Sequence, residues 1–207
     1  ALGRVRSTAL ALQLGDGVAA GTRRVRVLVV GETSAVVARM FATAGADVAT
    51  CDLKPSECTN IPHFLGDAAY IQDLGWDLVV AHPPCTYLSN AGLTWLYKEP
   101  NRYAHVVHNA SVFRRVYHAR APFVAVENTK MHGYAQRLVG VRPTQYVQPW
   151  QHGTGHSKTT ALYLRGLPPL RPSATVPGRV SAMARLPPSP DRGDLRSRTY
   201  IGIAAAM

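Results

Sequence analysis

A cysteine that follows two prolines at the end of an apolar run is the residue of this chain best suited to chemistry. Residues 76–81 read Trp-Asp-Leu-Val-Val-Ala, which predicts a short buried strand. Pro83 and Pro84 then remove two backbone donors and fix φ, so the chain leaves the sheet at a set angle. Cys85 follows at the carboxyl end of this strand, where open α/β sheets bind ligands. A thiol there can serve as a nucleophile, and the alternative is a small buried cysteine in a turn.

A carboxylate and an amide end the next apolar run. Residues 122–128 read Pro-Phe-Val-Ala-Val-Glu-Asn, which predicts a strand that ends at Glu127 and Asn128. If this strand is parallel to residues 76–81 and lies beside them, Cys85 and Glu127 emerge at the same edge of the sheet. The thiol and the carboxyl group then form a candidate active site.

The ordered pair Pro84-Cys85 and Glu127-Asn128 resembles the catalytic motifs of DNA cytosine-5 methyltransferases, most closely the small phage-type members. The resemblance covers residues 24–165 and the C-terminal end of the chain. It implies that the Cys85 thiolate adds to carbon 6 of cytosine and makes carbon 5 reactive toward a methyl group. It also implies that Glu127 donates a proton or a hydrogen bond at ring nitrogen 3, and that Asn128 holds the Glu127 loop.

A lysine stands where the family has a cation near the base. The family opens its last strand with Gln-x-Arg-x-Arg, and the matching positions here read His156-Ser157-Lys158-Thr159-Thr160. The resemblance implies that Lys158 supplies one of these cations, whereas the second arginine has no equivalent. The alternative for Lys158 is a solvated lysine at the start of a strand.

The first part of the chain predicts a βαβ unit of the nucleotide-binding kind. It consists of a strand at residues 24–31, a helix that Ser34 can cap, and a strand at residues 46–51, so that Gly31 and Asp52 lie at its carboxyl edge. The turn lacks Gly-x-Gly, which makes it poor support for a phosphate site on its own.

The acidic residues of this edge suit a cofactor without a phosphate. Glu32 would repel a phosphate and could receive the amino group of a methionine moiety, while Asp52 would hold ribose hydroxyls or be an ordinary turn aspartate. In the resembled family an acid at Asp67 bonds the adenine amino group, although Asp67 could also cap a helix predicted over residues 68–74. These roles fit S-adenosylmethionine. The resemblance implies cofactor contacts at Gly31, Glu32, Ser34, Asp52, Leu53, Asp67, Ala68 and Pro83.

Composition supports a basic α/β protein. The chain has 207 residues, with 23 Lys and Arg against 12 Asp and Glu, and a net charge of +11. This charge suits DNA, although a merely soluble basic surface would give the same balance. No run of about 18 apolar residues occurs, so we expect no membrane span. Neither the cysteines nor the pair His105 and His108 has a complete metal-ligand spacing, so we expect no metal. We expect a monomer in the cytoplasm of a bacterial host, encoded by a phage or prophage.

We predict a Rossmann-like S-adenosylmethionine-dependent methyltransferase fold, with a mostly parallel sheet that ends in a hairpin of residues 144–148 and 157–164. The predicted segments are an N-terminal extension (1–23), a catalytic domain (24–165), a Pro/Arg-rich linker (166–196) and a cofactor-side helix (197–207). The linker has too few residues for a target-recognition domain.

Three other functions stay open at this stage. A degenerate relative would bind DNA without methylating it. A pyrimidine-modifying enzyme would act on free nucleotides. An amino-group DNA methyltransferase would carry Asp or Asn before Pro-Pro and an aromatic residue after it, whereas this chain has His82 and Cys85.

Overall fold

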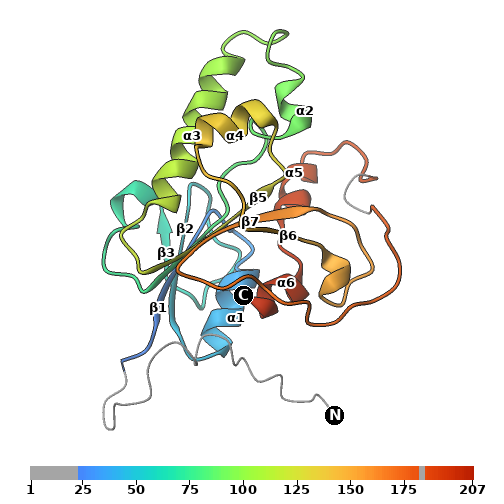
Figure 1. Cartoon of the computed structure of the whole chain (residues 1–207). Helices are drawn as coiled ribbons and strands as arrows, with labels where there is room; N and C mark the ends of the chain where they lie inside the picture. Colours follow the sequence, from blue (N-terminus) through green and yellow to red (C-terminus); the bar gives the residue numbers. More distant parts are fainter. Residues whose placement is uncertain (1–22, 182–184) are drawn as a thin grey trace.

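A seven-stranded sheet in the order β3-β2-β1-β4-β5-β7-β6 organises the computed structural model, which describes residues 23–181 and 185–207 (Figure 1). The strands are β1 (Arg26–Val30), β2 (Asp47–Asp52), β3 (His63–Leu65), β4 (Leu78–Ala81), β5 (Phe123–Thr129), β6 (Gln145–Val147) and β7 (Thr160–Arg165). Strands β1 to β5 run parallel to one another, whereas β7 is antiparallel to both β5 and β6. The predicted fold class, including the C-terminal hairpin, is confirmed.

Helices cover both faces of the sheet (Figure 1). They are α1 (Val36–Thr43), η1 (Ala68–Tyr70), α2 (Asn90–Leu93), α3 (Arg102–Tyr117), α4 (Gly133–Val139), η2 (Pro149–Gln151), α5 (Arg192–Ser197) and α6 (Ile201–Ala206). Because side chains alternate along a strand, Val27 and Val29 of β1 belong to the core that includes Ala38 of α1. Leu28 belongs to the opposite core, with Phe113 of α3. None of the helices in the described ranges is long and apolar enough to cross a membrane.

The sheet order determines where a ligand can bind. From β1 the chain moves outward to β2 and β3, then returns to β4 on the other side of β1 and continues to β5. The connections that follow β1 and β4 therefore lead away in opposite directions, and in doubly wound folds the crevice beyond the carboxyl ends of two such strands takes the ligand. The turns after β1 and β4 begin at Gly31 and His82, so both lie at this crevice.

Two local predictions were wrong. Ser34 does not cap α1: the N-cap residue is Ala35, in the left-handed region at φ 53°, and it has no side-chain capping bond. Glu32 caps the helix instead, because its carboxylate accepts the backbone N–H of Val37 at 2.9 Å and of Ala38 at 3.3 Å.

The helix predicted over residues 68–74 is only the single turn η1. Asp67 does cap this turn, since its carboxylate accepts the Ala69 N–H at 2.9 Å. After this turn the Ile71 carbonyl accepts both the Leu74 N–H at 3.2 Å and the indole N–H of Trp76 at 2.7 Å, and Gly75, at φ 71°, turns the chain toward β4. Of the extension predicted at 1–23, residues 1–22 lie outside the described residues.

Candidate active site

Cys85 is exposed in the loop that follows β4. Its backbone carbonyl accepts the N–H groups of Leu88 and Ser89, each at 3.0 Å, which closes a tight turn around the cysteine. The loop is also fixed from β5, because the buried Asn128 donates its side-chain N–H to the Pro83 carbonyl at 2.9 Å. Asn128 was expected to hold the Glu127 loop, and the contact that the structure gives it steadies the cysteine loop.

The register of β4 and β5 brings His82 and Glu127 together. Ala81 pairs with Val126, so the next residue of each strand continues at the same edge. His82 Nδ1 lies 2.7 Å from Glu127 Oε2, and the two side chains are only 9% and 11% exposed. Because an ionised carboxylate can only accept, Nδ1 is the protonated nitrogen of this bond. Thr199 Oγ1 lies 3.5 Å from the same carboxylate oxygen.

Opposing effects determine the charges of this pair. Burial alone would lower the pKa of His82, but the hydrogen bond and charge of Glu127, with the charge of Glu32 added, raise it above its ordinary value. Burial alone would raise the pKa of Glu127, but the hydrogen bond and charge of His82, together with Lys158, lower it. Both net shifts favour an imidazolium paired with a carboxylate.

The second ring nitrogen of His82 has a different environment. His82 Nε2 is buried and has no hydrogen-bond partner among the described residues. A buried polar atom of this kind is costly unless a water or a ligand satisfies it. The imidazole is therefore held at one nitrogen by Glu127 and is available at the other.

The thiol of Cys85 responds to the same charges. The residue reaches solvent, yet enough protein surrounds the sulfur that burial raises the pKa of the thiol, and the charge of Glu127 raises it further. The charges of Lys158 and Arg196 act in the opposite direction and offset part of this rise, but the pKa of the thiol stays above its ordinary value. Cys85, Glu127 and Lys158 therefore lie close enough to influence one another.

Lys158 reaches this edge from the loop before β7. Its Nζ donates to the backbone carbonyl of Arg198 at 3.2 Å and lies 5.9 Å from the ring centroid of Tyr200. The C-terminal segment that contains Arg196 and Thr199 is thus held beside the catalytic candidates. Sequence reasoning missed Arg196 and Thr199 because nothing in the local pattern links residues 192–200 to β5.

His82 was also missed as a site residue. Its signal was available, because a polar side chain at the end of a buried strand, directly before Pro83 and Pro84, lies at the same edge as Cys85. The sequence did not show that Glu127 would be its partner.

Gly31 is required by its contact with the β4 loop. The residue has φ 76°, and a Cβ placed there would lie 2.5 Å from the backbone oxygen of His82. Its N–H donates to the Cys51 carbonyl at 2.8 Å. The turn after β1 and the start of the cysteine loop are thus in direct backbone contact. Any side chain at Gly31 would push them apart.

The remaining cofactor candidates fall into two groups. The carboxylates of Glu32 and Asp67 already have protein partners: Glu32 caps α1, with Ser34 Oγ 3.3 Å away, and Asp67 pairs with Arg115 at 3.0 Å. Ala68 is the buried first residue of η1, and Pro83 is buried in the cysteine loop.

Asp52 and Leu53 are more open. Asp52 Oδ1 accepts the Lys54 N–H at 2.8 Å, whereas Oδ2 has no hydrogen-bond partner in the described part of the chain. Leu53 is 77% exposed beside it. A free carboxylate oxygen next to an exposed apolar side chain suits a ribose that carries a flat base. Asp52 and Leu53 therefore fit the nucleoside part of S-adenosylmethionine, whereas the ammonium contact predicted for Glu32 finds its carboxylate already bonded.

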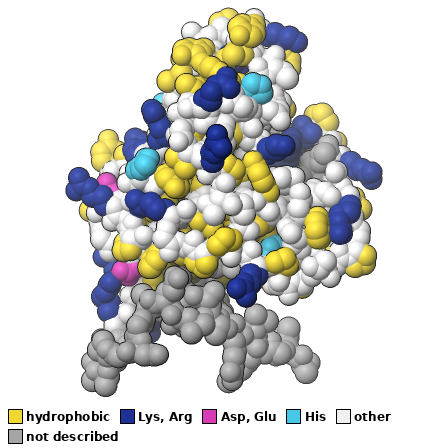
Figure 2. Space-filling model, in the orientation of Figure 1, with side chains coloured by type: hydrophobic (Ala, Val, Ile, Leu, Met, Phe, Trp, Pro, Cys, Tyr) yellow, Lys and Arg dark blue, Asp and Glu magenta, His cyan; other side chains and the backbone are white. Residues whose placement is uncertain are grey.

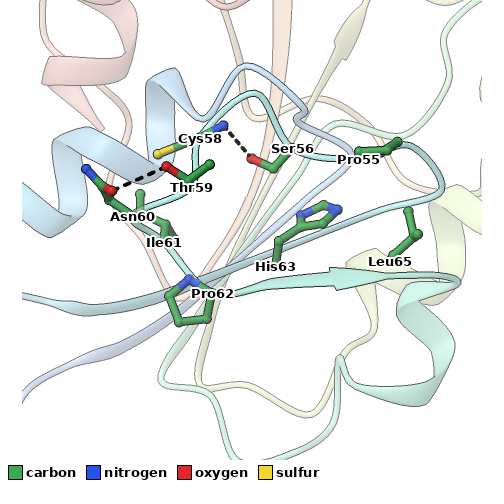
Figure 3. Close-up of a pocket in the computed structure, with 9 residues that line it drawn as sticks. All are labelled: Pro55, Ser56, Cys58, Thr59, Asn60, Ile61, Pro62, His63 and Leu65. Atoms are coloured by element: carbon green, nitrogen blue, oxygen red, sulfur yellow. Dashed lines mark hydrogen bonds between the residues drawn. The ribbon is translucent and has the colours of Figure 1, made fainter.

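A hollow of about 600 Å³ lies beside β3, and its lining contains none of the predicted catalytic or cofactor residues. Figure 3 shows its walls, which come from the loop of residues 55–62 and from His63 and Leu65. Cys58 is among the lining residues, and its N–H donates to Ser56 Oγ at 3.0 Å. The chemistry of the site is concentrated at β1, β4 and β5, so we do not assign the catalytic step to this hollow. Among the described residues no group of three metal-binding side chains occurs.

Comparison with known proteins gives only remote structural likenesses. No protein-family model and no curated protein matches the chain. A protein described as a DNA modification methyltransferase from an E. coli prophage is similar at TM-score 0.49 and 16% identity, over 79% of this chain and 55% of that one. The methyltransferase EhMeth of Entamoeba histolytica is similar at TM-score 0.49 and 12% identity, over 75% of this chain and 58% of that one. This chain thus spans little more than half of each, and the likenesses assign neither a substrate nor a residue.

Proposed function

We propose that this chain transfers a methyl group from S-adenosylmethionine to carbon 5 of cytosine in DNA, through a covalent adduct with Cys85. The observation that carries the proposal is the grouping of an exposed thiol with Glu127 and Lys158 at the carboxyl edge of β4 and β5. The order of the motifs Pro84-Cys85 and Glu127-Asn128 also supports the proposal, because it resembles the catalytic motifs of DNA cytosine-5 methyltransferases. The net charge of +11 supports a polyanionic substrate.

The first step is addition of the Cys85 thiolate to the ring. A bond forms between Sγ and carbon 6, and the electron pair of the carbon 5–carbon 6 bond shifts into the ring toward nitrogen 3. Lys158 assists because its positive charge lowers the pKa of the thiol and so increases the thiolate fraction. After transfer, a water molecule takes up the proton of carbon 5. The electron pair left behind re-forms the carbon 5–carbon 6 double bond as the Sγ–carbon 6 bond breaks, which restores the thiolate.

His82 and Glu127 handle the proton at nitrogen 3. Glu127 holds one carboxylate oxygen 2.7 Å from His82 Nδ1, which leaves the other oxygen for the base. When negative charge develops at nitrogen 3, the His82 imidazolium gives its Nδ1 proton to the Glu127 carboxylate, and the carboxylic acid so formed donates a proton to nitrogen 3. When the adduct breaks down, the proton returns by the same route.

S-adenosylmethionine supplies an electrophilic methyl group when bound. Asp52 would hold its ribose hydroxyls and Leu53 would cover one side of its base, while Gly31 lets the turn approach closely. A base in duplex DNA must leave the stack to reach Cys85, as it does in other enzymes that modify bases.

The test is methyl transfer from labelled S-adenosylmethionine to duplex DNA and, separately, to free cytidine nucleotides, followed by identification of the modified base. We expect 5-methylcytosine from DNA, no product with Cys85→Ala, and normal activity with the matched variant Cys58→Ala. DNA that contains 5-fluorocytosine should form a denaturation-resistant adduct, because fluorine cannot leave as a proton does. N4-methylcytosine, turnover by Cys85→Ala, or product only from free nucleotides would contradict the proposal.

A further inference from the structure

An aromatic groove lies outside the catalytic cluster, between α2, α3 and the start of α4. It has a volume of about 540 Å³ and is lined by Leu93, Leu96, Tyr97, Tyr103, His132 and Tyr134. Tyr97 is 97% exposed and Tyr103 is 56% exposed. A hydrogen bond with Tyr103, together with the nearby hydroxyl of Tyr97, raises the pKa of Tyr134, so the three phenol groups are neighbours. The apolar surface that Figure 2 shows at the top of the molecule lies over these helices.

Cations flank the aromatic rings of this region. Lys98 Nζ lies 5.5 Å from the ring centroid of Trp95, and the Arg137 guanidinium lies 5.8 Å from that of Tyr134. The one acid nearby, Glu99, is paired with Arg102 at 2.7 Å. The groove thus combines exposed aromatic faces with positive charge at its rim.

Most of the groove belongs to a stretch of the chain that is rich in Lys and Arg and nearly free of acidic residues. Between residues 100 and 190 the only acidic residue is Glu127, which is buried against His82, whereas lysines and arginines recur throughout. The acids visible in Figure 2 lie at the left and lower left of the view, away from its top. A surface of this kind attracts a polyanion, and phosphates on either side of a base would meet the rim cations.

Backbone contacts tie the groove to the nucleophile. The His132 N–H donates to the Leu88 carbonyl at 2.9 Å, and the Leu88 N–H donates to the Cys85 carbonyl at 3.0 Å. Ser89 forms a further bridge with Met131. The groove and Cys85 therefore border the same short loop.

We propose that the groove between α2, α3 and α4 holds an unstacked base of the DNA strand whose target cytosine lies at Cys85. This inference rests on the proposed function for its choice of DNA. Stacking on tyrosine is open to every base, so the groove adds affinity for distorted DNA without specifying a sequence. It also supplies a DNA contact in a chain whose residues 166–196 are too few for a recognition domain.

Fluorescence anisotropy of the full chain with labelled DNA tests this inference in the absence of S-adenosylmethionine. Three duplexes are compared: fully paired, with one bulged nucleotide, and with an abasic bulge at the same place. We expect the bulged duplex to bind more tightly than the abasic one. Tyr97→Ala and Tyr103→Ala should each remove this preference and weaken binding of the bulged duplex by about 5- to 100-fold, the effect of losing one stacked base.

The matched control is Tyr70→Ala, which removes a tyrosine that is 83% exposed on η1, beside the C-terminal end of α3, whereas the groove lies at the N-terminal end of that helix. It should bind all three duplexes as the parent does. Equal binding of the bulged and abasic duplexes by the parent, or groove variants that behave like Tyr70→Ala, would overturn the inference. A preference for single-stranded RNA over all three duplexes would overturn the choice of DNA.

The two proposals fail separately. A groove-dependent preference for bulged DNA without methyl transfer would contradict the proposed function and leave the stacking groove in place. Methyl transfer without that preference would contradict the stacking groove and leave the proposed function in place. Melting curves of the variants show whether each is folded.

Discussion

Replacement of His82 by phenylalanine tests the buried pair on which the proposed proton transfer depends. The change removes the imidazolium and leaves the Glu127 carboxylate, which is only 11% exposed, with Thr199 at 3.5 Å as its remaining side-chain contact. Removal of one partner of a buried ion pair destabilises a protein by about 3–5 kcal/mol. His82→Gln keeps a neutral donor, so we expect a smaller loss of about 1.5–3 kcal/mol.

The melting temperature converts these energies into a measurement. For a chain of this size, 1 kcal/mol corresponds to about 2–4 °C, so His82→Phe should lower the Tm by roughly 10 °C at neutral pH. His108→Phe is the matched control, because His108 is exposed on α3 and should tolerate the change.

The pH dependence separates the ion pair from simple packing. The pKa of His82 is raised above 6.5, so its contribution to stability is complete below 6.5 and is lost as the pH rises through the raised value. The pKa of Glu127 is lowered below 4.5, so its contribution is present above 4.5 and is lost as the pH falls through the lowered value. The Tm difference between parent and His82→Phe should therefore be greatest between pH 4.5 and 6.5, and it should shrink as the pH rises through the raised pKa of His82.

Calorimetric melts of the parent and the variants across this pH range provide the assay. A Tm loss in His82→Phe that is the same at every pH would show that shape, and not charge, determines the effect. A loss no larger than that of His108→Phe would refute the ion pair itself. Turnover should follow the same order, with His82→Gln retaining more methyl transfer than His82→Phe.

Two further predictions concern the turn and the thiol. Gly31→Ala should lower the free energy of unfolding, measured in urea titrations, by about 1–2 kcal/mol for its left-handed backbone, plus the cost of relieving the 2.5 Å contact with the His82 backbone oxygen. Gly45→Ala is the control for the backbone part, because Gly45 has φ 92° and open space around it. Equal losses in both variants would contradict the clash at Gly31. Because Lys158 lowers the pKa of the Cys85 thiol, Lys158→Met should slow alkylation of Cys85 by iodoacetamide at a fixed pH, as followed by mass spectrometry, and an unchanged rate would show that this charge does not reach the sulfur.

The sequence by itself determined the strands and the edge where the chemistry lies. Runs such as residues 76–81 and 122–128 are short, apolar and contain β-branched residues, which favours buried strands over helices. Once they are parallel neighbours, the residues after them emerge together, which is why the positions of Cys85 and Glu127 along the chain were enough to place both at one edge. The local turn chemistry was less secure: Glu32 took the capping role expected of Ser34 because its longer side chain reaches two amides of α1.

Only the tertiary structure decided which side chains meet at that edge. The contact between His82 and Glu127 joins residues 45 positions apart and depends on the register of β4 with β5, since a slip of one residue would turn the two side chains to opposite faces. Lys158 reaches the site because β7 runs antiparallel to β5, and Thr199 because α6 packs back against the sheet. Sequence patterns record local periodicity, whereas the partners of a buried charge are chosen by long-range packing and by the cost of leaving that charge unpaired.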